Sequence, residues 1–460
     1  MLFNSPIFIF FFLPTAYFVF WALHTKRSRY IWLTLTGYVF YAGWNPKFCL
    51  LMLFSTLVSY LAGLGFLRTS NPKVRKALLI TPITVDLMLL GFFKYCNMAI
   101  STWNWLSSGW GHSLPVLNII LPLGISFYTF HTITYIVDSY RGDIRPTRDF
   151  WEFSSYVSLF SQLVAGPIVR FRELQDDLEN IDRVNRWTYF NVGCSYFLVG
   201  LAQKLLLADT VASVIDPAFT DLAQLSTLGT WLCMLGYTYQ LYFDFAGYSN
   251  MAMGLGYLFG MHIPLNFNYP YRAVNPSDFW TRWHISLSRC LRDYLYIPLG
   301  GNRRGDARTY INLMTTMLIG GLWHGASWTF VAWGAYWGAL LCAYRVFRAR
   351  WDGLPALAQR LLTFVLAIFG WALFRATTWS AALTILNRML VPQRGIGFPG
   401  ETTLVIFLLI CAVFAHFEFS MDRLGEKWAW APDAAMAASF VICLAEIVGR
   451  TPSKFLYFQF

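Results

Sequence analysis

Long apolar runs alternate along the chain with short polar or charged stretches, and this pattern predicts membrane-crossing helices. A helix needs about 20 apolar residues to cross the hydrocarbon of a bilayer. Runs of this kind predict about ten to twelve crossings, some of them short or tilted. The expected spans are residues 5–23, 30–45, 48–67, 77–95, 115–137, 150–170, 189–206, 228–260, 310–345, 358–376, 403–420 and 434–450. Two of these runs, 228–260 and 310–345, are long enough for a pair of helices with a break between them.

Two charged segments interrupt this pattern. The stretch "RELQDDLENIDRVNRW" is too charged to cross a membrane, so we expect a surface helix or loop there. Residues 279–295 are too charged to cross and too apolar to be solvated, so they should lie in the membrane interface or enter it and return. A continuous helix would place Arg282, Arg289 and Arg292 on one side. His284 would lie on the opposite side and point into the protein.

The composition agrees with an all-α polytopic membrane protein. Hydrophobic residues make up 57% of the 460 positions and charged residues 13%, and the mean hydropathy is +0.46. An ordinary soluble domain is about 25% charged. Aromatic residues reach 19%, which is typical of proteins whose amphipathic rings lie at bilayer interfaces. No internal repeat or low-complexity linker is visible, so residues 1–460 are expected to form a single membrane domain.

The net charge of +11 has a membrane explanation. Basic clusters follow alternate early spans, at residues 26–29, 68–76 and 141–145, whereas the connection "WNPK" between the second and third spans is nearly uncharged. Lys and Arg concentrate in short cytoplasmic loops. We therefore expect the N-terminus outside and these clusters inside. The first apolar run has no basic residue before it and no small-residue cleavage site, which predicts a retained span and not a signal peptide.

The cysteines and histidines do not form a metal-ligand pattern. The eight cysteines are scattered singly, without a CxxC pair, and are expected to be small core residues. No His-x3-His pair occurs, so no metal is expected. A serine nucleophile signature of the G-x-S-x-G kind is also absent. No nucleic-acid-binding motif is recognisable either.

The stretch "GGLWHGASW" places His324 inside an apolar run with glycines on both sides. An ionisable ring at membrane depth costs free energy unless it is paired or lines a wet cavity, so it indicates a functional site. Small residues on its helix face would let a thin substrate or another backbone approach closely. From position alone, packing and catalysis both remain open. His131 and His416, also in apolar runs, are interpreted as packing residues, whereas His24, His112 and His262 lie near span ends.

Asp244, in "QLYFDFAGYSNMAMG", is the other buried charge that needs a partner. Taken alone, it is interpreted as a structural partner for an arginine. Lys204, in "GLAQKLLLAD", is expected to extend its amine toward the interface while its stem stays in the membrane.

Six motifs in this order resemble the membrane-bound O-acyltransferase family, within it the bacterial alginate O-acetylation proteins and their cellulose-acetylating relatives. They are "PLGISFYTF", "QLVAGPIVRF", "QLYFDFAGYS", "FWTRWHISLS", "LRDYLYIPLGGNR" and "GGLWHGASW". The final "FLYFQF" is similar to the carboxyl end of that subgroup. Departures from the subgroup are Asn250, where Asp is common, Thr281, where Arg is common, and a short segment before the last span.

This resemblance implies tilted helices around a thin centre, with a tunnel from a cytoplasmic donor side to an outer side. It implies that His324 is the catalytic histidine and His284 a second functional one. Acetyl-CoA would be the acyl donor, and the protein would lie in the bacterial inner membrane. A periplasmic acetyltransferase of the serine-hydrolase kind and the polysaccharide export machinery would be its partners. Donor binding is expected to rest on basic residues of the cytoplasmic face, namely Arg282, Arg289, Arg292, Arg303 and Arg304.

The chemistry of acyl transfer suits these residues. Moving an acyl group from a thioester to a hydroxyl needs a base for the hydroxyl proton, donors for the developing oxyanion and exclusion of water. An imidazole in an apolar tunnel supplies the base at neutral pH. The competing class is a transporter or channel whose histidines relay protons, although intramembrane carboxylates are scarce and no repeat is visible. Peptidoglycan and teichoic acid remain alternative acceptors.

Overall fold

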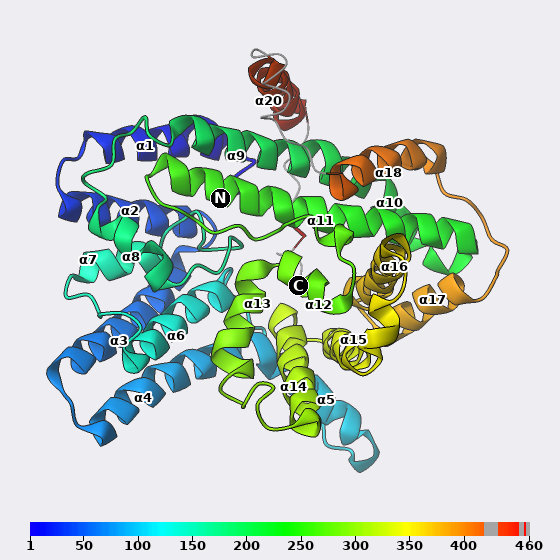
Figure 1. Ribbon diagram of the computed structural model, residues 1–460, viewed down its shortest axis with the longest axis horizontal. Helices are drawn as coiled ribbons and strands as arrows, with labels where there is room; N and C mark the ends of the chain where they lie inside the picture. The colour runs from blue at the N-terminus through cyan, green and yellow to red at the C-terminus, as the bar shows by residue number, and fades with distance from the viewer. Residues whose placement is uncertain (418–430, 450–454, 457–460) are drawn as a thin grey trace. The chain divides into compact units, whose positions relative to one another are not determined.

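The computed structural model describes residues 1–417, 431–449 and 455–456. That part of the chain is helical, and its only β pairing is an isolated parallel bridge between Leu225 and Ile396. The chain divides into two compact units, which are described separately (Figure 1). Unit 1 comprises Met1–Phe197 and Met251–Pro264, and unit 2 comprises Leu198–Asn250 and Leu265–Phe460.

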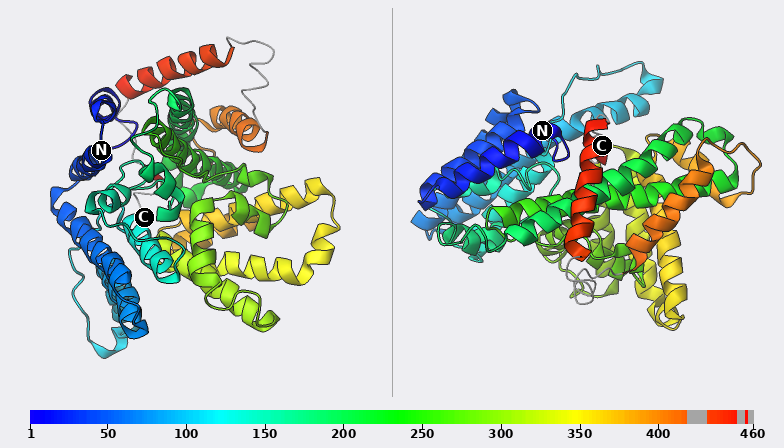
Figure 2. Two further views of the ribbon diagram at one scale, coloured as in Figure 1. Left: turned by 60° about the vertical axis from the view of Figure 1, so that its left-hand side comes forward. Right: turned by 90° about the horizontal axis from the view of Figure 1, so that it is seen from above.

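Unit 1 holds the helices of the first half of the chain. They are η1 (Phe8–Phe12), α1 (Leu13–Ala22), α2 (Lys26–Ala42), η2 (Pro46–Phe48), α3 (Cys49–Arg68), α4 (Pro72–Leu90), η3 (Gly91–Tyr95), α5 (Cys96–Leu106), η4 (Ser108–Trp110), α6 (Ile125–Arg141), α7 (Phe150–Val157), α8 (Phe171–Glu179) and most of α9 (Phe190–Ala202). Figure 2 shows the blue helices of this unit running beside one another. The buried carboxylate of Asp86 on α4 joins three of them, because it accepts hydrogen bonds of 2.7 Å from Ser55 on α3 and Thr132 on α6.

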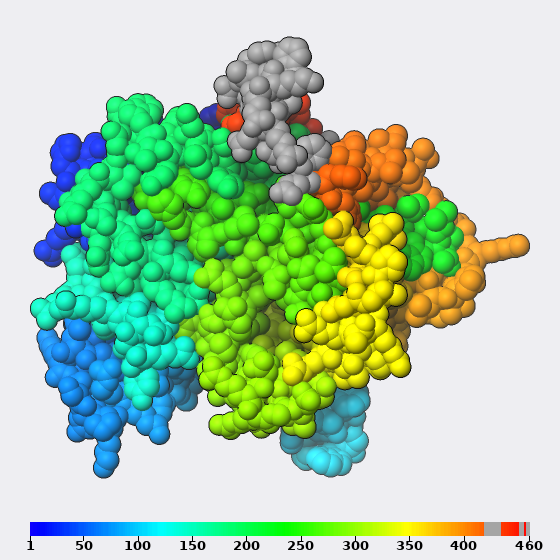
Figure 3. All heavy atoms as spheres, viewed as in Figure 1, coloured from blue at the N-terminus to red at the C-terminus, as the bar shows by residue number. Residues whose placement is uncertain are grey.

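Unit 2 holds the remaining helices. They are η5 (Gln203–Ala208), α10 (Asp209–Thr220), η6 (Leu222–Gln224), most of α11 (Thr227–Leu258), η7 (Pro270–Arg272), α12 (Pro276–Arg282), α13 (Ile285–Leu291), η8 (Arg292–Tyr296), α14 (Asp306–His324), α15 (Trp328–Asp352), α16 (Ala356–Arg375), α17 (Trp379–Leu390), α18 (Glu401–His416) and α20 (Ala431–Gly449). Figure 3 shows α13, α14 and α15 reaching the surface together on one face of this unit.

Five helical stretches of the described residues are long and apolar enough to cross a membrane. They are Pro46–Arg68, Pro72–Leu106, Phe190–Thr220, Trp328–Asp352 and Ala356–Arg375. Shorter apolar helices occur at Phe8–Ala22, Glu401–His416 and Ala434–Gly449. The chain is therefore an all-helical, multi-pass membrane protein, as its apolar runs predict. The prediction of a single domain remains a prediction.

Two expected spans are wrong because turn residues interrupt their apolar runs. The run 115–137 begins with an extended segment, and α6 starts only at Ile125, after the left-handed Gly124. The side chains of Asn97 and Asn104 on α5 each form two hydrogen bonds with the backbone of this segment, which satisfies groups that a helix would have paired internally. The run 150–170 forms only the eight-residue α7, followed by turns.

The two runs that are long enough for a pair of helices differ in whether the helix breaks. The run 228–260 forms the unbroken α11 of 32 residues, about 48 Å long at 1.5 Å per residue. A break in this run was therefore the wrong prediction. The run 310–345 does break, at residues 325–327, into α14 and α15. These two helices approach closely at Gly321, where a Cβ would lie 2.3 Å from the carbonyl oxygen of Phe330.

Asp244 pairs with a lysine and not with an arginine, which corrects both charge interpretations. The Nζ of Lys204 lies 2.5 Å from Oδ1 of Asp244 and 2.7 Å from Oδ1 of Asp209. Its side chain is only 5% exposed, so these carboxylates hold its amine inside the protein. The other oxygen of Asp244 accepts a hydrogen bond of 2.8 Å from the backbone N–H of Leu456. The carboxylate thus holds α11, η5 and the described end of the chain together. Of "FLYFQF", residues 457–460 lie outside the described residues.

Candidate functional site

His324 is the last residue of α14, and the glycine that follows it explains how the chain turns there. Gly325 has an extended backbone, and a Cβ there would lie 2.2 Å from the Phe330 ring. Glycine at this position therefore lets the chain turn tightly from α14 into α15. The imidazole is 4% exposed and packs against two aromatic rings, with ring centroids 4.8 Å from Trp333 and 5.3 Å from Phe374.

His284 interrupts the helix that the sequence predicts over residues 279–295. It lies between α12 and α13 with φ 44° and ψ 55°, in the left-handed region. A residue with a Cβ is uncommon there, and such strained positions cluster at functional sites. The break ends the helical register, so the predicted division into an arginine side and a histidine side is wrong. The expectation that the ring points inward is correct, since His284 is fully buried.

A hydrogen-bond network fixes the His284 ring and its tautomer. Oδ1 of Asn266 accepts hydrogen bonds from the backbone N–H and the hydroxyl of Ser286, at 3.2 and 2.9 Å. A backbone N–H can only donate, so the atom facing it must be the amide oxygen. The same oxygen lies 3.2 Å from Nδ1 of His284, which must therefore carry the proton. Nε2 is then the basic nitrogen of His284.

The two histidines approach each other within unit 2. Their ring centroids are 6.5 Å apart. Trp323 lies close to both, at 5.8 Å from the His284 ring and 5.0 Å from the His324 ring. Phe245 covers another side of His284 at 4.7 Å. Aromatic rings therefore surround much of the pair, and the low polarity of such surroundings strengthens electrostatic interactions with a bound group.

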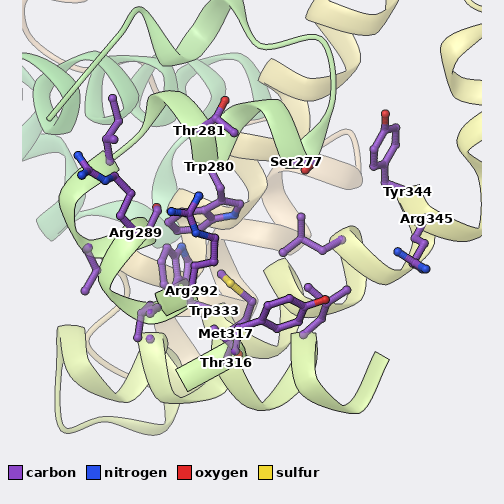
Figure 4. A pocket seen from close by; sticks show the side chains of 18 of the residues that line it. Ser277, Trp280, Thr281, Arg289, Arg292, Thr316, Met317, Trp333, Tyr344 and Arg345 are labelled. Carbon is purple, nitrogen blue, oxygen red and sulfur yellow. The ribbon is translucent and has the colours of Figure 1, made fainter. Parts of the chain in front are cut away.

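A cavity of about 560 Å³ has His324 among its lining residues. Figure 4 shows this cavity, with Trp280, Arg289 and Trp333 labelled among its lining side chains. One wall is a single face of α14, with lining residues spaced three or four apart, namely Leu313, Thr316, Met317, Gly320 and His324. Trp280 and Trp333 line it from α12 and α15. The other end is exposed, because Arg292 and Arg348 line it with side chains 59% and 71% exposed. The cavity thus connects an exposed basic mouth with a buried imidazole.

Arginines give the cavity mouth its charge. Arg289, Arg292, Arg345 and Arg348 line it. Three of them make ion pairs with carboxylates: Arg292 with Asp293, Arg345 with Asp306 and Arg348 with Asp352. Exposed ion pairs of this kind contribute only about 0–1 kcal/mol to the free energy of folding. These guanidinium groups can therefore leave their carboxylates and bind a phosphate instead.

The residues predicted to bind a donor fall into two groups. Arg289 and Arg292 line the cavity. Arg282 is not among its lining residues, and its Nε lies 2.9 Å from Oδ1 of Asp278. Arg303 is exposed in the turn before α14 and is also not among them. The charge pattern of the sequence therefore grouped arginines of which two line the cavity and the others do not.

Several residues of this site carry no sequence signal strong enough to find them. Asn266 lies in a loop 18 residues before His284 and is completely buried. Arg345 and Arg348 lie on α15, where the basic end of a span predicts only a cytoplasmic boundary. Thr281, a departure from the subgroup, lines the cavity, whereas Asn250 donates a hydrogen bond to Gln203. Among the described residues no cluster of three or more potential metal ligands occurs.

Comparisons with known proteins identify a family and several similar chains. The pattern that defines the membrane-bound O-acyltransferase family matches residues 138–352, which include both histidines. A probable alginate O-acetylase of Pseudomonas aeruginosa is 40% identical over 455 residues, covering 95% of this chain and 85% of that protein. A protein with the same description from Pseudomonas putida is 38% identical and covers 100% of both chains. A peptidoglycan O-acetyltransferase of Helicobacter pylori is 37% identical, covering 85% of this chain and 80% of that protein.

Proposed function

The chain belongs to the membrane-bound O-acyltransferase family, and from this premise we propose that it moves an acetyl group from cytoplasmic acetyl-CoA toward an exported polysaccharide. The observation that carries the proposal is the cavity, because it joins the exposed arginines to the buried imidazole of His324. Phosphates of the donor would bind Arg289, Arg292, Arg345 and Arg348. Its pantetheine arm would lie along α14 and present the thioester to His324.

His324 acts as the general base in this proposal. Its imidazole takes the proton of the acceptor hydroxyl while the hydroxyl oxygen attacks the acetyl carbonyl carbon. The carbon–sulfur bond then breaks, the acetyl ester forms, and the leaving thiolate takes the proton back from the imidazolium. His284, with Nε2 as its basic nitrogen, would help to orient the reacting groups, since its ring centroid lies 6.5 Å from that of His324. The surrounding aromatic rings exclude water, which would otherwise hydrolyse the donor.

Inside-out membrane vesicles test the donor and its side of entry. Radiolabelled acetyl-CoA added to the outside of such vesicles faces the cytoplasmic surface of the protein. We expect label to reach an acceptor in vesicles with the wild-type chain, and not in vesicles with His324→Ala. Right-side-out vesicles given the same donor should remain unlabelled. Equal labelling by His324→Ala, or labelling from the outer side alone, would contradict the proposal.

We further propose a bacterial inner-membrane location with the loops at residues 26–29 and 68–76 in the cytoplasm. The support is the concentration of Lys and Arg in those loops. Single cysteines introduced there in a cysteine-free chain should resist membrane-impermeant thiol reagents in intact spheroplasts. A cysteine between α2 and α3 should react in the same cells. Labelling of the basic loops from outside would overturn this topology.

We propose that an outer-face partner, a serine-hydrolase-like acetyltransferase, completes the transfer to the polymer. The described loops between helices are short, so the described part of the chain offers no sizeable domain outside the membrane that could hold a long polysaccharide. The direct acceptor would then be a hydroxyl on that partner. Purified protein that acetylates polymer alone, at the rate measured in cells, would contradict this dependence.

The polymer is proposed to be of the alginate or cellulose type. Three proteins described as probable alginate O-acetylases are 38–42% identical to this chain. The relative that acts on peptidoglycan, at 37% identity, supports a second candidate acceptor. Deleting the gene and measuring acetyl esters on the exported polysaccharide and on peptidoglycan separately distinguishes them. Loss of esters from peptidoglycan alone would favour the second acceptor.

A further inference from the structure

In unit 1, α5 and the extended segment after it form a hairpin, residues 96–121, which we call the α5 hairpin. Two asparagine side chains on α5 join its arms. The amide of Asn97 exchanges two hydrogen bonds, of 2.9 and 3.0 Å, with the backbone of Leu117. The amide of Asn104 exchanges two, of 2.9 and 2.7 Å, with the backbone of Leu114. Both arms are therefore held together by side chain to backbone pairs.

The spacing of the two asparagines matches the geometry of the two arms. Asn104 lies two helical turns after Asn97, so both are on one face of α5, about 10 Å apart along its axis. Leu114 and Leu117 are also about 10 Å apart along an extended chain. Pro115, between these leucines, has no N–H that needs a partner. The hairpin thus supplies hydrogen bonds to a non-helical backbone, which hydrocarbon could not supply.

The surface of the α5 hairpin is apolar and uncharged. None of the eleven residues of α5, all of them described, is buried. Trp105 and Trp110 are 75% and 74% exposed. The other large hydrophobic residues exposed on the hairpin are Trp103, Leu106, Leu114, Val116, Leu117 and Ile120. The sequence has no Asp, Glu, Lys or Arg between Lys94 and Asp138. An exposed apolar patch of this kind indicates a contact surface.

The length of the helix places the hairpin at the far edge of the hydrocarbon. The stretch Pro72–Leu106 has 35 residues, which corresponds to about 52 Å, whereas the hydrocarbon is about 30 Å thick. Lys73 and Lys76 mark the end of α4 that lies at one interface. Cys96, the first residue of α5, lies about 30 Å from Lys76 along the helix. The hairpin therefore begins where the hydrocarbon ends on the opposite side.

We propose that the α5 hairpin binds phospholipid, lying in the interface opposite the basic end of α4. Tryptophan is enriched in this zone, because its ring is apolar and its N–H is polar. The asparagine pairs let an extended chain lie beside hydrocarbon, where backbone groups find no water. In the topology proposed above, this is the outer interface. The hairpin anchors the long helix there and limits its tilt and depth.

Site-directed fluorescence in phospholipid nanodiscs tests the lipid contact. Single cysteines introduced as Trp105→Cys or Val116→Cys in a cysteine-free chain carry a bimane label. A phosphatidylcholine with a nitroxide close to its head group should quench both labels, and more strongly than one with the nitroxide at the end of its acyl chain. Iodide in the water should quench them about fivefold less than it quenches Arg183→Cys, because the hairpin residues are withdrawn from water.

Arg183→Cys is the matched control, since it lies in the exposed charged segment before α9. Iodide should quench it and the nitroxide lipids should not. Equal quenching of the hairpin and control labels by iodide would place the hairpin in water, where its apolar surface would fit a protein, and would overturn the proposal. Strongest quenching by the nitroxide at the chain end would place it in the hydrocarbon and also overturn the interface position.

The asparagine pairs are tested with Asn97→Ala/Asn104→Ala in the Val116→Cys chain. Reaction of this cysteine with a membrane-impermeant maleimide should become about tenfold faster, because the unpaired backbone of the extended segment leaves the lipid for water. Asn185→Ala removes a hydrogen bond to the backbone N–H of Trp187 in an exposed loop and should not change the rate. An unchanged rate in the double variant would contradict the role of the asparagines. The quenching experiment keeps both asparagines, so it stands even if this variant folds poorly.

Discussion

His131 and His324 are both buried histidines on apolar helices, yet only one of them has the surroundings of a catalytic group. His131 on α6 is fully buried and packs against the Tyr156 ring, with centroids 5.4 Å apart. His324 is nearly as buried, but it terminates its helix at a glycine turn and lines a cavity with a basic mouth. Burial alone therefore does not identify a catalytic histidine. The cavity that would admit a substrate distinguishes His324 from His131.

The largest expected effect separates these two residues directly. His324→Ala should lower polymer acetylation in cells by about two to four orders of magnitude, the usual contribution of a positioned base. His131→Ala should change the rate per folded molecule by less than about twofold, because it removes packing and not chemistry. Acetyl esters per polymer repeat are measured beside the membrane abundance of each variant. Similar losses in both variants would remove the distinction.

His284 and Asn266 should behave as one unit with a smaller effect. His284→Ala is expected to lower the rate by about tenfold to 100-fold, since it removes a ring that faces Trp323 and His324. Asn266→Ala should cause a similar loss because the amide oxygen fixes the His284 tautomer. The double variant should be no worse than His284→Ala. Additive losses would show that Asn266 acts independently of the histidine.

The basic mouth should affect donor binding more than chemistry. The double variant Arg289→Gln/Arg292→Gln should raise KM for acetyl-CoA by about tenfold and leave kcat nearly unchanged, since charge-assisted phosphate contacts are lost. Acetyl-pantetheine, which lacks the nucleotide phosphates, is the matched donor and should be insensitive to these changes. Arg282→Gln, outside the cavity lining, is the control variant. A larger effect of Arg282→Gln would place donor recognition elsewhere.

The smallest effect on catalysis is expected from the buried carboxylate of unit 1. Asp86→Ala removes the acceptor of the buried Ser55 hydroxyl, at a cost of about 1–3 kcal/mol for a buried polar group, whereas Thr132 keeps the backbone carbonyls of Tyr128 and Thr129 as acceptors. The melting temperature in detergent should fall. The rate per folded molecule should stay close to wild type, as for His131→Ala. A selective loss of rate without loss of stability would give unit 1 a chemical role.

The sequence predicts the helical framework better than it predicts the site. Each of the five described stretches that are long and apolar enough to cross a membrane overlaps an apolar run that predicts a span. The run 310–345 breaks into two helices, as its length allows. The helix break at His284 could not be predicted, because helical periodicity continues through it and only the backbone reveals the left-handed conformation. Turn residues such as Gly124 ended two runs that hydropathy alone extends across the membrane.

The other features that the sequence could not predict are side-chain contacts between residues far apart in the chain. Asn266 reaches His284 across a loop, and Lys204 reaches Asp244 from another helix. Neither pair has a helical spacing, so no periodicity indicates it. The motif resemblance singled out both histidines, whereas the division of the arginines between the cavity and its surroundings required side-chain positions.

Donor binding and single-turnover transfer, measured on the same purified His324→Ala protein, test the central claim most directly. The account predicts that the Kd for acetyl-CoA stays within about threefold of wild type while the transfer rate at saturating donor falls by about 100-fold or more. Binding must be retained because the arginine mouth and the α14 wall remain intact. A transfer rate equal to wild type, or a loss explained entirely by weaker binding, would contradict His324 as the base.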